Sequence, residues 1–254
     1  MTIVNLAGFA HTRGPEAEVR KVNVGLTKTL AEEAARIGVK RFIFVSSIQA
    51  VTKKAADKES VNINALALPE GAYGRSKLEA EKLLRELSVE IQMEVVIIRP
   101  PLVYGPGVKE NFLNLLGLVA KDFPIPLAAM DRNRRSFVAV SNLIDLILIC
   151  LEHPAAANQT FHVSDDDDVS TAELLRRIGK ALGKSVRNLP IPAPVLKGGL
   201  HLAGKGEWVE KLFGDLRVDI EHTKRTLGWE PVVKMEEELG LTAKWWRESR
   251  QGQL

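Results

Sequence analysis

A tyrosine and a lysine four residues apart, Tyr73 and Lys77, are the residues of this sequence best suited to acid–base chemistry. They lie at the start of a helical run, where this spacing places both side chains on one helix face, one turn apart. A lysine ammonium held near a phenol stabilises the phenolate and lowers the pKa of the phenol. A tyrosine tuned in this way acts as a general base near neutral pH. The structural alternative is an exposed lysine beside a half-buried tyrosine.

Strands that alternate with helices surround this pair. The predicted strands are residues 3–7, 41–47 and 94–99, and the predicted helices are residues 15–37 and 73–91. Such alternation indicates parallel βαβ units. In open parallel sheets, ligands bind beyond the carboxyl ends of the strands. Gly8, Ser47 and Pro100 follow the three strands, so we expect them on one edge, close to Tyr73.

The second half of the chain is less regular. The predicted elements are helices at 111–119, 141–151, 170–182 and 235–250 and strands at 137–140 and 161–163. Residues 190–206 are rich in proline and glycine and indicate a loop or a mobile lid. The acidic run at 165–168 favours a solvated turn before a helix N-terminus over a metal site.

Composition excludes several classes of protein. The chain has 254 residues, 45% of them hydrophobic, which is enough for one large or two modest domains. Its net charge of +3 is spread along the sequence and gives no nucleic-acid patch. Cys150 is the only cysteine and lies in an apolar run, which predicts a buried, inert thiol. That run is too short to cross a bilayer. No basic segment precedes an apolar stretch at the N-terminus, so a cytoplasmic location is expected.

Four stretches occur in an order that points to a family. They are Asn5-Leu6-Ala7-Gly8, Val45-Ser46-Ser47-Ile48, Tyr73-Gly74-Arg75-Ser76-Lys77 and Arg99-Pro100-Pro101-Leu102-Val103-Tyr104-Gly105-Pro106-Gly107. Residues 134–138, 216–219 and 224–231 continue the pattern. The sequence resembles an extended short-chain dehydrogenase/reductase, in the NAD-dependent epimerase/dehydratase family of sugar-nucleotide enzymes, over essentially its whole length.

The resemblance implies an α/β fold built on a Rossmann-like, doubly wound parallel sheet with a smaller C-terminal α/β substrate-binding region. Residues 1–107, with about 136–165, would form a partial NAD-binding domain. About 108–135 and 166–254 would form the substrate-binding region.

The resemblance also assigns catalytic roles. Tyr73 would exchange a proton with the 4-hydroxyl of the sugar while hydride moves to or from the nicotinamide. Lys77 would bind the nicotinamide ribose and lower the pKa of Tyr73. Ser47 would hydrogen-bond the reacting oxygen, unless it is a strand-end serine that satisfies the backbone. Ser46 would turn to the other face of an alternating strand.

Binding roles follow from the same resemblance. Ala7 and Gly8 would let the cofactor approach the strand end, and Pro100 would line the nicotinamide pocket. Asn23 would position the catalytic segment, or would face solvent from its helix. The substrate diphosphate would meet Asn111, with Arg134 and Arg217 as cationic clamps. The five histidines match no metal spacing.

The implied activity oxidises and re-reduces C4 of a UDP-hexose through NAD, in the manner of UDP-glucose 4-epimerases. NADP is the alternative cofactor, and a homodimer is a further expectation. A 4-keto-sugar-nucleotide reductase is the second enzyme hypothesis. Ser47-Ile48-Gln49 stands where dehydratases of the family carry Thr-Asp-Glu, which argues against a dehydratase. A non-catalytic sugar-nucleotide-binding member is the hypothesis from another class.

One part of the family pattern is missing from this sequence. Its nineteen glycines include no Gly-x-x-Gly-x-x-Gly turn, and residue 1 matches the start of what resembles the fourth strand of the family. That turn normally holds the dinucleotide pyrophosphate at a helix N-terminus. We therefore expect the chain as written to bind NAD weakly and to self-associate through an open sheet edge.

Overall fold

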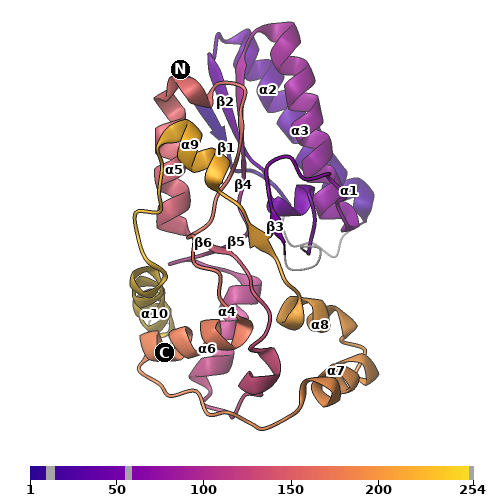
Figure 1. Ribbon diagram of the computed structural model, residues 1–254. Helices are drawn as coiled ribbons and strands as arrows, with labels where there is room; N and C mark the ends of the chain where they lie inside the picture. Colours follow the sequence, from indigo (N-terminus) through magenta and orange to yellow (C-terminus); the bar gives the residue numbers. More distant parts are fainter. Residues whose placement is uncertain (10–14, 55–58, 252–254) are drawn as a thin grey trace.

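A parallel sheet organises the computed structural model, which describes residues 1–9, 15–54 and 59–251 (Figure 1). The strand order is β1-β2-β4-β7, with bounds Thr2–Asn5, Arg41–Val45, Glu94–Arg99 and Thr160–His162. Ile43 pairs with Val4 on one side and with Val96 on the other. The predicted parallel architecture is confirmed, and the strand predicted at 94–99 has those bounds.

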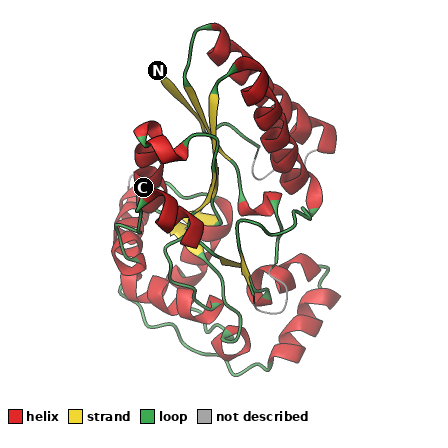
Figure 2. Ribbon diagram, turned by 45° about the horizontal axis from the view of Figure 1, so that its top comes forward, coloured by secondary structure: helices red, strands yellow, loops and turns green. Residues whose placement is uncertain are grey.

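Alternation along β2 separates two hydrophobic cores. Phe42 and Phe44 face a core shared with α2 and α3, whereas Ile43 faces a core shared with α5. These helices span Thr27–Arg36, Gly71–Ile91 and Val140–Glu152. Figures 1 and 2 show α2 and α3 on one face of the sheet and α5 on the other. A strand covered on both faces needs apolar residues at every position, which explains the continuous run in β2.

The helix predicted at 15–37 is interrupted by a π-helical segment. α1 spans Glu16–Arg20, the π-helical segment η1 spans Lys21–Leu26, and α2 follows. π-Turns are rare and are frequently found at functional sites. Asn23, which lies in η1, is completely buried. The solvent-facing alternative for Asn23 is therefore wrong.

A second group of elements lies beyond the carboxyl ends of the sheet (Figure 1). Helices α4, α6 and α10 span Glu110–Ala120, Thr171–Leu182 and Met235–Gln251 and share a third core. Two short parallel pairs accompany them: β5 with β6, at Leu102–Tyr104 and Phe137–Ala139, and β3 with β8, at Ser60–Val61 and Arg217–Val218. Ser170 caps α6 as expected, because its Oγ accepts a hydrogen bond from Glu173 N at 3.0 Å. The proposed division into two domains remains a prediction.

The loop or lid predicted at 190–206 is wrong. Helix α7 spans Ala193–Leu202, and α8 follows at Gly206–Phe213, while α9 spans Glu221–Leu227. Pro192 and Pro194 lie at the very start of α7, where a missing backbone N–H removes no helical hydrogen bond. Prolines at this position begin a helix, although the same residues elsewhere would break one.

The solvated turn predicted for the acidic run is wrong for Asp165. This carboxylate is buried and accepts hydrogen bonds from Tyr104 OH at 2.7 Å and Ala139 N at 2.7 Å. Asn142 Nδ2 donates a third at 2.8 Å. Local sequence patterns do not predict hydrogen bonds between residues so far apart in the sequence. The structure shows no metal-ligating cluster among the described residues.

Two expectations from composition can be checked against the fold. Cys150 is fully buried, and burial raises the pKa of its thiol to about 12, as expected for an inert thiol. Within residues 1–9, 15–54 and 59–251, the helices are all too short or too polar to cross a bilayer.

We predict that Gly74→Ala destabilises the fold although alanine is the better helix former. A Cβ at position 74 would lie 2.4 Å from the backbone oxygen of Gln49, so α3 and the turn after β2 that contains Gln49 would have to separate. The expected loss is about 1–3 kcal/mol in the free energy of unfolding, measured by urea denaturation.

Gly240→Ala is the matched control, because Gly240 lies in α10 with nothing within 4 Å of its added Cβ. It should gain about 0.5–1 kcal/mol from helix propensity. Equal changes in the free energy of unfolding at both positions would show that the close contact at Gly74 does not affect stability.

Candidate functional site

The structure brings Tyr73, Lys77 and Ser47 together at the carboxyl end of β2. Tyr73 and Lys77 lie in the first two turns of α3, and Ser47 follows β2 and begins the 3₁₀ turn η2, Ile48–Ala50. The Ser47 Oγ accepts a hydrogen bond from Gln49 N at 3.2 Å, so it also satisfies the backbone. Gly74 lets η2 approach α3 closely, because no side chain stands between its backbone and Gln49. Tyr73 and Lys77 therefore lie next to the end of β2, as predicted.

Lys77 is a buried cation, with 3% of the residue exposed. Its Nζ donates a hydrogen bond to the Val45 carbonyl oxygen at 3.0 Å and lies 4.5 Å from the centre of the Phe44 ring. Burial lowers the pKa of Lys77 to about 8, and the Glu81 carboxylate acts against that fall. The ammonium form consequently predominates at neutral pH. The alternative of an exposed lysine is wrong.

The expected lowering of the Tyr73 pKa by Lys77 is not found. Burial raises the pKa of Tyr73, and the hydrogen bond with Ser47 acts against that rise. The Lys77 ammonium is directed at the Val45 carbonyl, and desolvation of the phenolate is the larger effect. Tyr73 is thus a neutral phenol in this state, and Ser47 is the group that favours its ionisation.

The two serines after β2 face different partners. Ser46 Oγ donates a hydrogen bond to Glu81 Oε1 at 2.6 Å, away from the tyrosine hydroxyl that Ser47 contacts. The predicted difference between Ser46 and Ser47 is confirmed. Ser46 therefore supports the site through a buried hydrogen bond with Glu81.

Asn23 connects the chain segment that follows β1 with α3. Its Oδ1 accepts from Phe9 N at 2.6 Å, and its Nδ2 donates to Ser76 Oγ at 2.9 Å. Ser76 Oγ in turn donates to the Tyr73 carbonyl oxygen at 2.8 Å. Asn23 thus fastens the chain after Gly8 to the turn of α3 that carries Tyr73, which is the positioning arrangement the sequence suggested.

Gly8 provides a close approach to Lys77. A Cβ at this position would lie 3.0 Å from Lys77 Nζ and 3.3 Å from Asn23 Oδ1. Ala7 precedes it on the exposed end of β1, where its N–H donates to Asn5 Oδ1 at 2.9 Å. The absence of a side chain at Gly8 keeps the space above the ammonium open.

A pocket of about 180 Å³ opens beside Tyr73. Its lining is Phe9, Val19, Gln49, Lys53, Glu70, Gly71, Ala72 and Tyr73. Pro100 follows β4 and is buried, and its carbonyl oxygen accepts from Ile48 N at 2.9 Å. This hydrogen bond joins the chain segments that follow β2 and β4.

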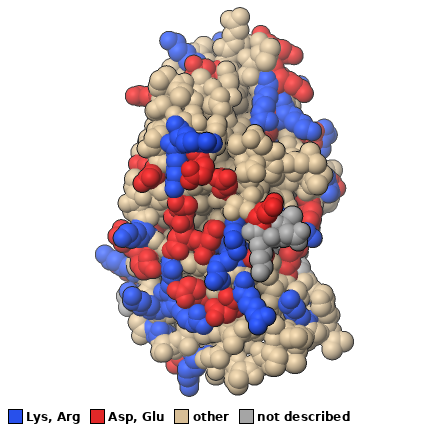
Figure 3. Space-filling model, in the orientation of Figure 1, with Lys and Arg blue, Asp and Glu red and all other residues tan. Residues whose placement is uncertain are grey.

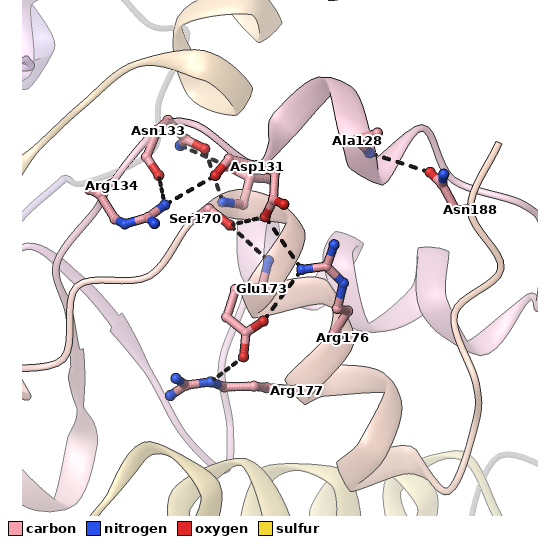
Figure 4. Close-up of polar contacts among 10 residues, drawn as sticks. Ala128, Asp131, Asn133, Arg134, Ser170, Glu173, Arg176, Arg177 and Asn188 are labelled. Carbon is pink, nitrogen blue, oxygen red and sulfur yellow. Dashed lines mark hydrogen bonds and ion pairs between the residues drawn. The ribbon is translucent and has the colours of Figure 1, made fainter. Parts of the chain in front are cut away.

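The predicted substrate clamps, Arg134 and Arg217, lie on segments of the chain other than α3. Arg134 and Arg217 are close in the fold, because Leu216 N donates to the Arg134 carbonyl oxygen at 3.0 Å. In Figure 4 the Arg134 guanidinium turns back onto its own loop, where it donates to the carbonyl oxygens of Asp131 at 3.1 Å and Asn133 at 2.9 Å. Within the described part of the chain, Arg217 Nε is buried without a hydrogen-bond partner. The positive charge of Arg217 also acts on the Asp168 carboxylate, where it opposes the rise in pKa that burial causes.

Asn111 lies in the first turn of α4, and its side chain is outside the described residues.

Charges of both signs are intermixed on the face shown in Figure 3, in line with the small net charge.

Sequence reasoning missed Glu81 and Arg99. Glu81 is completely buried and forms an ion pair with Arg99 at 2.6 Å, directly behind the site. Its position four residues after Lys77 was the available signal, but a glutamate inside a helix usually faces water.

Comparisons with known proteins agree with this geometry. The model of the family described as "NAD dependent epimerase/dehydratase family" matches residues 1–164. A UDP-glucose 4-epimerase of Vibrio cholerae is 46% identical over 246 residues, which cover 95% of this chain and 75% of that protein.

Two solved structures share the fold. A UDP-glucuronic acid 4-epimerase from Bacillus cereus in complex with NAD has a TM-score of 0.77 at 18% identity, covering 97% of this chain and 74% of that one. A UDP-glucose 4-epimerase from Thermotoga maritima with UDP-glucose has a TM-score of 0.74 at 21% identity, covering 98% of this chain and 78% of that one. The family match and the Vibrio cholerae relative establish that the chain belongs to the NAD-dependent epimerase/dehydratase family.

Proposed function

We propose that this protein is a UDP-hexose 4-epimerase that oxidises and re-reduces C4 of its substrate with NAD. The observation that carries the proposal is the convergence of Ser47, Tyr73 and Lys77 at the end of β2, with Tyr73 lining a pocket, in a chain 46% identical to a UDP-glucose 4-epimerase. Bound NAD supplies hydride exchange at C4. The nicotinamide end fits the residues present, because Gly8 leaves open space beside Lys77 and because Pro100 lies at the neighbouring strand end.

The chain's own residues move and hold the proton. Because the pKa of Tyr73 is raised in this structure, the phenol must first lose its proton, and the resulting phenolate takes the proton of the 4-hydroxyl during oxidation and returns it during reduction. Ser47 hydrogen-bonds the tyrosine hydroxyl and favours its ionised form. The Lys77 ammonium, protonated below a pKa of about 8, adds a positive charge one helical turn away.

We predict that Tyr73→Phe abolishes epimerisation and leaves UDP-sugar binding nearly unchanged, because only the proton-transferring hydroxyl is removed. General acid–base catalysis contributes about 10²–10⁴-fold, so turnover of UDP-glucose to UDP-galactose should fall by that factor. Turnover is measured by chromatography of the two UDP-sugars with saturating NAD.

Tyr104→Phe is the matched control, because the chain has only two tyrosines. Tyr104 bonds to Asp165 in a hydrophobic core, so its loss should lower stability by about 1 kcal/mol and leave turnover intact. A Tyr73→Phe variant with more than about a tenth of wild-type turnover would remove Tyr73 from the proposed mechanism.

We predict that Arg217→Ala weakens UDP binding and leaves NAD binding unchanged. A charge-assisted contact to phosphate is worth about 1.5–3 kcal/mol, which calorimetry resolves as a rise in the Kd for UDP. Arg36→Ala is the control, since Arg36 lies exposed at the end of α2 in an ion pair with Glu33. Equal UDP affinity in wild type and Arg217→Ala would refute the clamp role.

A further inference from the structure

One carboxylate holds together the two strand ends that carry the site. Glu81 Oε1 accepts hydrogen bonds from Ser46 Oγ at 2.6 Å and from Arg99 Nε at 3.0 Å. Glu81 Oε2 accepts from Arg99 Nη2 at 2.6 Å. Glu81 is fully buried, and Ser46 and Arg99 are 3% and 6% exposed, so water does not compete for these bonds. A fork-shaped guanidinium bound at both oxygens leaves the carboxylate little freedom.

The partners of Glu81 stand next to the groups that define the site. Ser46 lies between Val45, whose carbonyl accepts from Lys77, and Ser47, which contacts Tyr73. Arg99 precedes Pro100, whose carbonyl accepts from Ile48 N at 2.9 Å. Movement of Glu81 would therefore displace both strand ends at once.

Glu81 lies four residues after Lys77, one turn further along α3, so both residues are on the same face of the helix. The other groups around this ammonium are neutral: Tyr73 on the same helix, the Phe44 ring and Val45 carbonyl of β2, and Gly8 with Asn23 across the site. Arg99 and Arg85 are the cations facing Glu81, with Arg85 at 3.7 Å and half exposed. Glu81 raises the pKa of Lys77 against the effect of burial.

We propose that Glu81 is a positioning residue of the site, which fixes the ends of β2 and β4 through Ser46 and Arg99 and places a negative charge on the face of α3 that carries Lys77. Its importance for turnover rests on the proposed function. Its effect on the charge of Lys77 does not, and so it is measured without turnover.

The test is a pH titration of the lysine side chains, followed by NMR on protein labelled with ¹³C at Cε. The Lys77 signal is assigned from its absence in Lys77→Arg. Wild type should show a midpoint of about 8. In Glu81→Gln the midpoint should fall by about 1 pH unit, because a neighbouring opposite charge is removed.

The same two strands supply the control. Arg41 in β2 and Glu94 in β4 form an ion pair at 2.7 Å, at the amino ends of the strands and away from the site. Glu94→Gln removes a carboxylate from this strand pair and should leave the Lys77 midpoint at its wild-type value.

Two further variants cover a failure of Glu81→Gln to fold, since that change leaves Arg99 buried without its partner. Glu81→Gln with Arg99→Met removes both charges, and Ser46→Ala removes only the neutral ligand. The double variant should show a smaller fall in the Lys77 midpoint than Glu81→Gln, because the Arg99 cation is removed together with the carboxylate. Ser46→Ala should keep the midpoint and lower kcat, because the strand end loses an anchor while the Glu81 charge remains.

The outcomes separate the two proposals. An unchanged Lys77 midpoint in Glu81→Gln and in the double variant would overturn the role of Glu81, as would an equal shift in Glu94→Gln. In an active enzyme, the alkaline limb of the kcat/KM profile should move to lower pH together with the midpoint. A lowered midpoint in a protein whose wild type lacks epimerase activity would retain the role of Glu81 and reject the proposed function.

Discussion

The burial of one ammonium group constrains the whole catalytic end of this fold. Lys77 is 3% exposed, and a buried cation is tolerated only with partners close at hand. The Val45 carbonyl and the Phe44 ring supply those partners from the last residues of β2. Glu81 supplies a compensating charge from the next turn of α3. The end of β2 and the start of α3 must therefore pack against each other in one fixed position.

Two glycines make that meeting possible. Gly74 removes the side chain that would collide with the Gln49 carbonyl, so the turn after β2 packs directly on α3. Gly8 leaves room over Lys77 from the end of β1. The result is that Ser47 reaches the Tyr73 hydroxyl although the two residues lie 26 positions apart in sequence. Stability and the proposed chemistry thus depend on the same close contacts.

The sequence predicted the strands of the main sheet and the meeting of Tyr73, Lys77 and Ser47, because fully covered parallel strands appear as apolar runs with distinct ends. It did not predict the short strands β3, β5 and β8. It did not predict the π-turn, since the apolar spacing over 15–37 fits an unbroken helix equally well. Prolines at the start of α7 were interpreted as a loop signal. The pKa of Tyr73 and the partners of Glu81 depend on burial and on distant residues, which local patterns do not contain.

The most direct measurement follows deuterium placed at C4 of UDP-glucose through the reaction with NAD. If Tyr73 and Lys77 serve an oxidation and re-reduction at one carbon, UDP-galactose should form with the deuterium retained at C4, because only the proton on oxygen passes through the protein. Absence of interconversion, loss of deuterium to solvent, or release of a 4-keto product would contradict the account.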